Sequence, residues 1–208
     1  MTHSSSTTPQ EEFWAGTFGD DYIDRNDSSA LVAGKTAAFA QILTRTAAIQ
    51  SVAELGCNVG INLQAIRHLL PAARLEAVEI NEKAADLARQ RLESATVVTG
   101  SLFDYEPSAP VDLAFTCGVM IHLEPKSLPR AYERLAAASS RYVAIAEYYN
   151  PSPMTLPYRG NDEKLFKRDF AGEFMDAHPE YRLLDYGFFY RRDGNFPLDD
   201  ITWFLMEK

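Results

Sequence analysis

One glycine-containing segment limits what this chain can fold into more than any other feature of its sequence. Residues 52–62 read VAELGCNVGIN, an apolar run that passes through Glu54 into Gly56 and Gly60. An alanine- and leucine-rich segment, residues 63–70, follows directly. Glycines at such a turn let the backbone change direction sharply and approach a ligand closely. The segment therefore predicts a strand, a tight ligand-binding turn and a helix.

The next apolar run, residues 75–78, ends in an acid that suits this interpretation. Glu79 lies 19 residues after Gly60, where an acidic side chain can bind both hydroxyls of a ribose. Asn58 stands where the dinucleotide fingerprint G-x-G-x-x-G needs its second glycine, and that glycine serves to admit a pyrophosphate. Its absence favours a nucleoside ligand without phosphates, and we expect S-adenosylmethionine (SAM).

Length and composition limit the class of protein. The chain has 208 residues, of which 46% are hydrophobic, enough for one well-buried α/β domain and too few for two ordinary ones. Its net charge of −9 argues against nonspecific nucleic-acid binding, which needs a basic surface. Cys57 and Cys117 lie in apolar runs without CxxC or Cys/His spacing, so we expect no metal site, no disulfide framework and a reducing, cytoplasmic setting.

The ends of the chain and its apolar runs also bear on location. No apolar stretch approaches the roughly 20 residues of a membrane span, so we expect no membrane partner. Residues 1–10 are polar and rich in Ser and Thr, without the basic start or apolar middle of a signal peptide. We expect this stretch to be a disordered tail, and residues 11–208 to form a single domain.

Strand-like and helix-like segments alternate along most of the chain. We expect strands at 51–55, 74–79, 96–99, 111–117 and 142–147, and helices at 30–46, 63–70, 82–94 and 128–139. This alternation predicts a mostly parallel sheet with helices on both faces. Residues 162–175 are expected to be a charged, aromatic helical region, and the β-rich runs 182–190 and 201–207 to form an antiparallel hairpin. Such a seven-stranded sheet resembles the Rossmann-like fold of class I methyltransferases.

The carboxyl ends of the parallel strands are where ligands bind in such sheets. The resemblance to class I methyltransferases implies that the first loop holds the amino-acid end of SAM, that Glu79 holds the ribose, and that Ile80, Ser101 and Leu102 surround the adenine. The expected cofactor contacts of the first and fourth loops are Glu54, Gly56, Cys57, Asn58, Gly60, Asn62, Cys117 and Gly118. Asn58 and Asn62 have a second interpretation, as caps of the following helix.

An aromatic segment precedes this core. Phe13, Trp14, Phe18 and Tyr22 lie within residues 11–29 and either cover one end of the sheet or form a lid that excludes water and faces the sulfonium cation. We favour the lid, with Trp14 and Tyr22 as cofactor contacts. Arg25 is expected to pair with the SAM carboxylate, because a guanidinium binds a carboxylate bidentately.

Several long strings of residues resemble one family, the methylases associated with pseudaminic acid biosynthesis. The similarity begins at Glu11 with EEFWAGTFGDDYIDRN and runs almost to the end of the chain. The other strings are IAEYYNPSP (145–153), PYRG (157–160), LFKRDFAG (165–172), DYGF (185–188) and NFPLDDITWFLMEK (195–208). The resemblance implies a SAM-dependent enzyme without fixing its acceptor.

The last third of the chain supplies the residues expected to act on an acceptor. His122 is either a general base or a core or capping histidine. The basic residues after Tyr158 form either a solvated helix face or a pocket for an anionic acceptor. We expect the catalytic residues to be His122, Glu147, Tyr149, Asn150 and Tyr158, and the substrate-binding residues to be Tyr148, Arg159, Lys167 and Arg168.

Three functions fit these features. The first is methyl transfer from SAM to the amine or hydroxyl of a small sugar-like or amino acid-like molecule, with S-adenosylhomocysteine as product. The second is cyclisation of SAM by its own amine, which forms azetidine-2-carboxylate and methylthioadenosine inside a closed aromatic cage. The third is a SAM-binding module without catalysis. The sequence leaves the acceptor and the oligomeric state open.

Overall fold

The computed structural model describes residues 7–23 and 29–208. Its strands are β1 (Ser51–Leu55), β2 (Arg74–Glu79), β3 (Ala95–Thr99), β4 (Val111–Cys117), β5 (Ser139–Glu147), β6 (Met154–Tyr158), β7 (Asn161–Lys167), β8 (Arg182–Phe188) and β9 (Thr202–Glu207). The α-helices are α1 (Pro9–Ala15), α2 (Thr17–Ile23), α3 (Ser29–Ile42), α4 (Ile61–Leu69), α5 (Glu82–Arg91), α6 (Leu128–Ala138) and α7 (Phe170–Ala177). Short 3₁₀ turns are η1 (Leu43–Arg45), η2 (Leu102–Asp104), η3 (Met120–His122) and η4 (Pro125–Ser127).

Seven strands form one sheet in the order β3-β2-β1-β4-β5-β9-β8. The first five strands are parallel to one another, and β9 pairs antiparallel with both β5 and β8. The predicted seven-stranded sheet with its antiparallel end is confirmed. The strand order reverses direction between β1 and β4, and this switch point is where ligands bind in doubly wound sheets.

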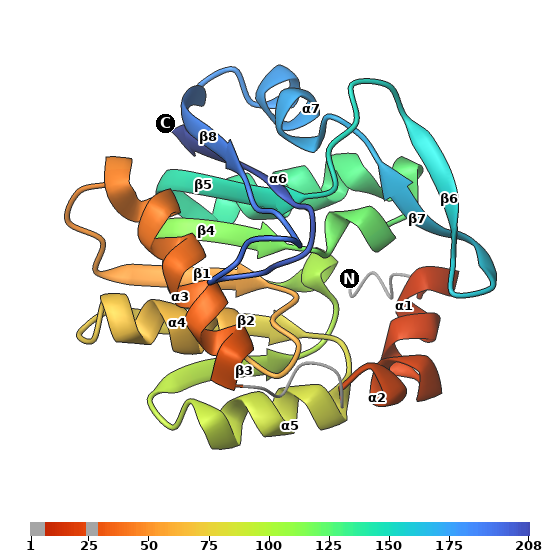
Figure 1. Ribbon diagram of the computed structural model, residues 1–208, viewed down its shortest axis with the longest axis horizontal. Helices are drawn as coiled ribbons and strands as arrows, with labels where there is room; N and C mark the ends of the chain where they lie inside the picture. The colour runs from red at the N-terminus through yellow and green to blue at the C-terminus, as the bar shows by residue number, and fades with distance from the viewer. Residues whose placement is uncertain (1–6, 24–28) are drawn as a thin grey trace, which may run out of the picture.

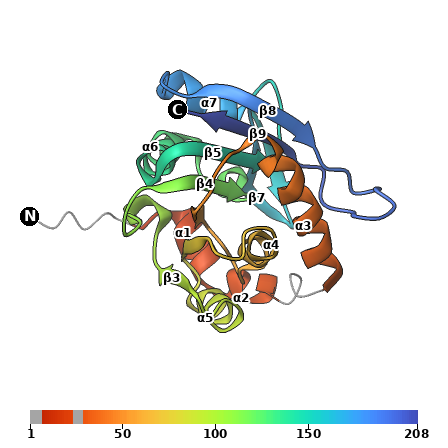
Figure 2. The same cartoon turned by 90° about the vertical axis from the view of Figure 1, so that its left-hand side faces the viewer.

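Helices cover both faces of this sheet. Helices α3, α4 and α5 lie on one face, and α6 and α7 lie on the other (Figures 1 and 2). The central strands are buried along nearly their whole length, which explains why their sequences are mostly apolar. The buried acids Glu54 and Glu76 are exceptions. The elements α1 and α2 lie beyond the carboxyl ends of β1 and β4 (Figure 1).

Two parts of the structure differ from the sequence-based expectation. Residues 162–175 are not one helix, because β7 pairs antiparallel with β6 in a separate two-stranded sheet before α7 begins. Part of the predicted tail, residues 1–10, is also ordered differently from the expectation. Thr8 caps α1 through a capping box with Glu11, so Pro9 and Gln10 are already helical. None of the helices within the described ranges is long and apolar enough to cross a membrane.

Candidate functional site

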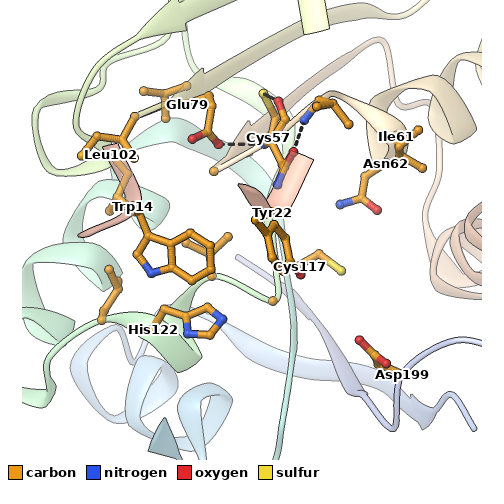
Figure 3. Close-up of a pocket in the computed structure, with 18 of the residues that line it drawn as sticks. Trp14, Tyr22, Cys57, Ile61, Asn62, Glu79, Leu102, Cys117, His122 and Asp199 are labelled. Atoms are coloured by element: carbon orange, nitrogen blue, oxygen red, sulfur yellow. Dashed lines mark hydrogen bonds between the residues drawn. The ribbon is translucent and has the colours of Figure 1, made fainter. Parts of the chain in front are cut away.

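A cavity of about 550 Å³ lies at the carboxyl edge of the parallel strands. Its walls come from the loops after β1, β2, β3 and β4, from α1, α2 and α3, and from the segment between β8 and β9 (Figure 3). The predicted site residues that line it are Trp14, Tyr22, Gly56, Cys57, Asn58, Asn62, Glu79, Ile80, Ser101, Leu102, Cys117, Gly118, His122 and Arg159. Ligand pockets of this size hold small molecules.

The glycine loop after β1 is held tightly against its neighbours. The backbone amides of Gly56 and Cys57 both donate to the Val78 carbonyl, at 2.9 and 3.1 Å. Gly56 has φ +82°, and a Cβ there would lie 2.7 Å from a methyl group of Val119. Asn58 is also left-handed, with φ +47°. The loop therefore needs glycine at position 56 and brings its backbone close to the cavity.

The two asparagines of this loop do not cap the helix, as one interpretation expected. Gly60 is the N-cap of α4, whereas the Asn58 side chain accepts from the Val59 amide at 2.6 Å. Asn62 lies inside the first turn of α4, where its Nδ2 donates to Glu54 Oε1 at 2.6 Å. Both side chains are among those that line the cavity, so the interpretation as ligand contacts is the one that their positions favour.

Glu54 lies beneath the loop and is not one of the cavity-lining residues. It is completely buried, and burial raises the pKa of its carboxyl to about 8, against the opposing effects of the Asn62 hydrogen bond and of Lys35. Its Oε2 has no hydrogen-bond partner within the described chain. Glu54 therefore positions Asn62 rather than lining the ligand cavity itself.

Glu79 closes β2 with its carboxylate at the cavity wall. Its Oε2 accepts from the Asn58 amide at 2.7 Å, and its Oε1 accepts from the Asn81 amide at 2.8 Å. Burial raises the pKa of the Glu79 carboxyl, while these backbone donors lower it. Two fixed donors therefore orient the carboxylate, which keeps further acceptor capacity because each oxygen has two lone pairs. This geometry suits a pair of vicinal hydroxyls.

An apolar slot adjoins Glu79. Ile80, Leu102 and Phe103 line it together with Ser101. The Ser101 hydroxyl accepts from the Phe103 amide at 3.1 Å and so caps η2. A flat base packs well against apolar walls of this kind, and the slot lies directly beside Glu79.

Several charged residues of the cavity were not predicted from the sequence, among them Lys35 and Asp199. Lys35 on α3 donates through Nζ to Cys117 Sγ at 3.3 Å. Burial lowers the pKa of Lys35, but the Cys117 thiol and the carboxylates of Glu54 and Asp199 outweigh it, so the net shift is upward. Asp199, between β8 and β9, accepts a hydrogen bond from the Tyr148 side chain. No sequence motif marks Lys35 as a site residue, because most of its neighbours in the helix are apolar or small.

His122 lies in η3 with 8% of its surface exposed. Its Nδ1 is 2.8 Å from the Lys164 carbonyl. Because a carbonyl only accepts, Nδ1 carries the hydrogen and Nε2 keeps its lone pair. Burial lowers the pKa of the ring to about 4, so the neutral form persists at neutral pH. The Trp14 ring packs on the imidazole, with centroids 4.6 Å apart (Figure 3).

The aromatic residues of the N-terminal helices contact the β6–β7 hairpin. Phe13 stacks on Phe18 at 4.1 Å, and Trp14 packs edge-on against Tyr22 at 5.4 Å. Tyr158 of the hairpin lies 6.0 Å from Phe18 and 4.8 Å from His122 between ring centroids. Trp14 and Tyr22 line the cavity. The position of these helices agrees with a lid that closes one side of the cavity. Arg25, the expected partner of a carboxylate, lies outside the described residues.

Most of the expected acceptor residues point elsewhere. Tyr149 is 41% exposed and packs near Phe204, and the Asn150 side chain donates to the Ser152 carbonyl at 2.5 Å. Lys167 lies over the Tyr148 ring, and Arg168 pairs with Glu173 at 2.7 Å. These side chains contact neighbouring groups, and Tyr149, Asn150, Lys167 and Arg168 are not among the residues that line the cavity. Of the expected substrate-binding residues, Arg159 lines the cavity.

Glu147, which was expected to be catalytic, is buried and does not line the cavity. It is 2% exposed. Its Oε1 accepts from the Thr116 hydroxyl at 2.5 Å and from the amides of Val119 and Met120 at 3.0 and 3.1 Å. Burial raises the pKa of its carboxyl, and these donors lower it. Glu147 therefore fixes the loop that carries His122.

Comparisons with known proteins agree with this fold. Residues 52–140 match the family model described as a methyltransferase domain. A search of curated protein sequences found no match. The matched segment spans the glycine loop, Glu79 and the third and fourth strands, which build part of the cavity.

Solved structures resemble nearly the whole chain at low identity. Magnesium protoporphyrin IX methyltransferase from Synechocystis PCC 6803, with bound SAM, is 13% identical with a TM-score of 0.68, and the alignment covers 99% of this chain and 100% of that one. The 1,6-didemethyltoxoflavin-N1-methyltransferase of Burkholderia thailandensis is 16% identical with a TM-score of 0.69, covering 100% and 93%. The N-methyltransferase NodS of Bradyrhizobium japonicum WM9 is 12% identical with a TM-score of 0.64, covering 88% and 90%.

The fold is that of the class I, Rossmann-like methyltransferases. The matched domain and this fold together support a SAM-dependent methyltransferase, the enzyme class expected from the sequence.

Proposed function

We propose that the cavity binds SAM and that the protein transfers its methyl group to the amine or hydroxyl of a small polar molecule. One observation carries this proposal. Glu79, oriented by the amides of Asn58 and Asn81, faces the cavity beside the glycine loop. An oriented carboxylate next to an apolar slot fits a nucleoside, because it accepts from both ribose hydroxyls while the base packs on Ile80 and Leu102.

The charge distribution of the cavity suits the remaining parts of SAM. Lys35 offers an ammonium at the end near Cys117, which fits a ligand carboxylate. The rings of Trp14 and Tyr22 lie on the lid side, and aromatic faces attract a cation such as a sulfonium. When bound, SAM supplies an electrophilic methyl group, whose bonding electron pair stays with sulfur on transfer.

The residues of this chain would contribute positioning and a proton acceptor. Neutral His122 holds an Nε2 lone pair and can take the proton that an amine or hydroxyl loses. The loop anchored by Glu147 holds the imidazole in place. The lid helices would exclude water, which strengthens electrostatic interactions inside the cavity. The resemblance to methylases associated with pseudaminic acid biosynthesis supports a sugar-like or amino acid-like acceptor.

Cyclisation of SAM is the second candidate, and a specific observation favours it. Tyr148, Tyr149, Lys167 and Arg168 do not line the cavity, so the expected anionic acceptor pocket is not formed by these residues. An intramolecular reaction needs no such pocket. It needs an enclosed aromatic surround, and Trp14, His122 and Tyr158 pack together at this side of the cavity.

Product analysis distinguishes the candidates. The pure protein is incubated with SAM alone and then with a panel of amine and sugar acceptors, and the nucleoside products are separated. S-adenosylhomocysteine that forms only with an acceptor supports methyl transfer. Rapid formation of methylthioadenosine without acceptor supports cyclisation and overturns our first proposal. Binding of SAM without turnover would indicate a module that binds SAM without catalysis.

A further inference from the structure

The first turn of α1 carries a buried polar group that the proposed function has not used. Gln10 is 7% exposed and lines the cavity. Its Oε1 accepts no hydrogen bond from any residue in the ranges 7–23 and 29–208. A buried acceptor without a donor costs about 1–3 kcal/mol, and most such groups in native proteins have a partner. A ligand in the cavity is the natural source of that donor.

A second buried polar atom lies one helical turn away. Trp14 Nε1 is buried without an acceptor among the described residues, and Trp14 lines the same cavity. Residues four apart lie on one face of a helix. The capping box of Thr8 and Glu11 fixes where α1 begins, and so fixes the direction of this face. One face of the helix thus contributes an unpaired acceptor and an unpaired donor to the lining of the cavity.

This face lies beside the slot proposed for the base. The Asn81 side chain donates to the Trp14 carbonyl at 3.3 Å, and Asn81 directly follows Ile80. Trp14 and Leu102 both line the cavity (Figure 3). The Ser101 hydroxyl accepts from the Phe103 amide, and the other side chains there are apolar. Gln10 and Trp14 therefore supply two polar atoms that have no hydrogen-bond partner in the described part of the chain.

We propose that Gln10 and Trp14 recognise the edge of the adenine, a role that rests on the proposed binding of SAM. Adenine presents a 6-amino donor beside the N1 acceptor, which is complementary to Gln10 Oε1 and Trp14 Nε1–H. Hypoxanthine presents the reverse pattern, an O6 acceptor beside an N1–H donor. The pair selects adenine, and Gln10 is a specificity-determining residue contributed by the lid rather than by the sheet.

Calorimetric titration with two nucleosides tests this assignment. The ligands are S-adenosylhomocysteine and S-inosylhomocysteine, which differ only in the base. We expect the wild-type protein to prefer the adenine ligand about tenfold, the effect of one to two hydrogen bonds. Gln10→Leu should reduce the preference to within about twofold. Gln10→Glu should keep it, because a carboxylate only accepts and cannot present an amide N–H to O6.

Glu12→Leu, at an exposed position of the same helix, serves as the matched control and should retain the wild-type preference. Melting temperatures of all variants check that they fold. The inference is overturned if Gln10→Leu keeps the wild-type preference, or if it lowers the affinities for both ligands equally. If the wild-type protein binds neither nucleoside, the proposed function itself fails. If it binds S-adenosylhomocysteine and the preference survives Gln10→Leu, the adenine assignment alone is overturned.

Discussion

The polar side chains of the cavity differ in the hydrogen-bond partners that the protein itself supplies. Both oxygens of Glu79 accept from backbone amides, so the protein has oriented this group in advance. Lys35 has a thiol as its hydrogen-bond acceptor, and sulfur is a weak acceptor for an ammonium. We expect groups with weak hydrogen-bond partners, such as Lys35, to gain the strongest new interactions when a ligand binds.

Replacing Lys35 tests whether it holds the ligand carboxylate. Lys35→Met keeps the length of the side chain and removes its charge, so we expect SAM to bind roughly 10- to 100-fold more weakly, the value of a charged hydrogen bond. The affinity for decarboxylated SAM should change by less than about threefold. Lys126→Met, at a side chain with 75% exposure, is the control. Equal weakening of both ligands in calorimetry would contradict the assignment.

His122 predicts a specific pH dependence of stability. Its pKa in the folded state is about 4, below the unfolded value near 6.5. Below pH 6.5 the unfolded chain therefore binds a proton that the folded protein does not, and stability falls as the pH falls. We expect this residue to account for a loss of about 2 kcal/mol between pH 7 and pH 5.

Urea unfolding of His122→Gln at both pH values measures that contribution. The variant should lose less stability between pH 7 and pH 5 than the wild-type protein. His68→Gln, at an exposed histidine of α4, should follow the wild-type curve. An unchanged pH dependence in His122→Gln would show that the imidazole is not held neutral by burial.

At the scale of elements, the strands were more predictable than the segments that cover them. Strands β1, β2 and β4 have the bounds expected from the sequence, because buried parallel strands are continuous apolar runs between turn residues. Residues 162–167 were expected to be part of a helical region, 162–175, because charged and aromatic residues dominate it. They form β7 through pairing with β6, as in Leu156 with Leu165, which a local pattern does not reveal. Asp169, the N-cap of α7, was a signal for the true start of that helix.

Glu147 connects β5 to the loop that carries His122. We expect its removal to lower the stability of the fold, rather than to affect turnover alone. Glu147→Ala leaves the Thr116 hydroxyl and the amides of Val119 and Met120 without their acceptor. We expect the free energy of unfolding to fall by roughly 3 kcal/mol or more. Glu147→Gln keeps a carbonyl acceptor and should lose less. Abolished turnover with unchanged stability in thermal unfolding of Glu147→Ala would instead support a catalytic role.

At the scale of the whole molecule, the cavity joins segments that are distant along the chain. The loops after the parallel strands were predictable, since parallel strands place their carboxyl ends at one edge of the sheet. Gln10, Lys35 and Asp199 were not, because α1, α3 and the β8–β9 segment reach the cavity through tertiary packing. Tyr149 was expected in the site because it follows the strand at 142–147, and Arg168 because it belongs to the basic group after Tyr158. Their side chains instead contact Phe204 and Glu173.

We propose that this cavity binds SAM through Glu79. Calorimetric titration of the wild-type protein, Glu79→Ala and Glu82→Ala with S-adenosylhomocysteine tests it most directly, with thermal unfolding to confirm that the variants fold. Glu82 is an exposed acid in the first turn of α5. We predict one site per chain in the wild-type protein, an affinity loss on the order of 100-fold in Glu79→Ala, and wild-type affinity in Glu82→Ala. Absence of binding to the wild-type protein, or wild-type affinity in Glu79→Ala, would contradict the account.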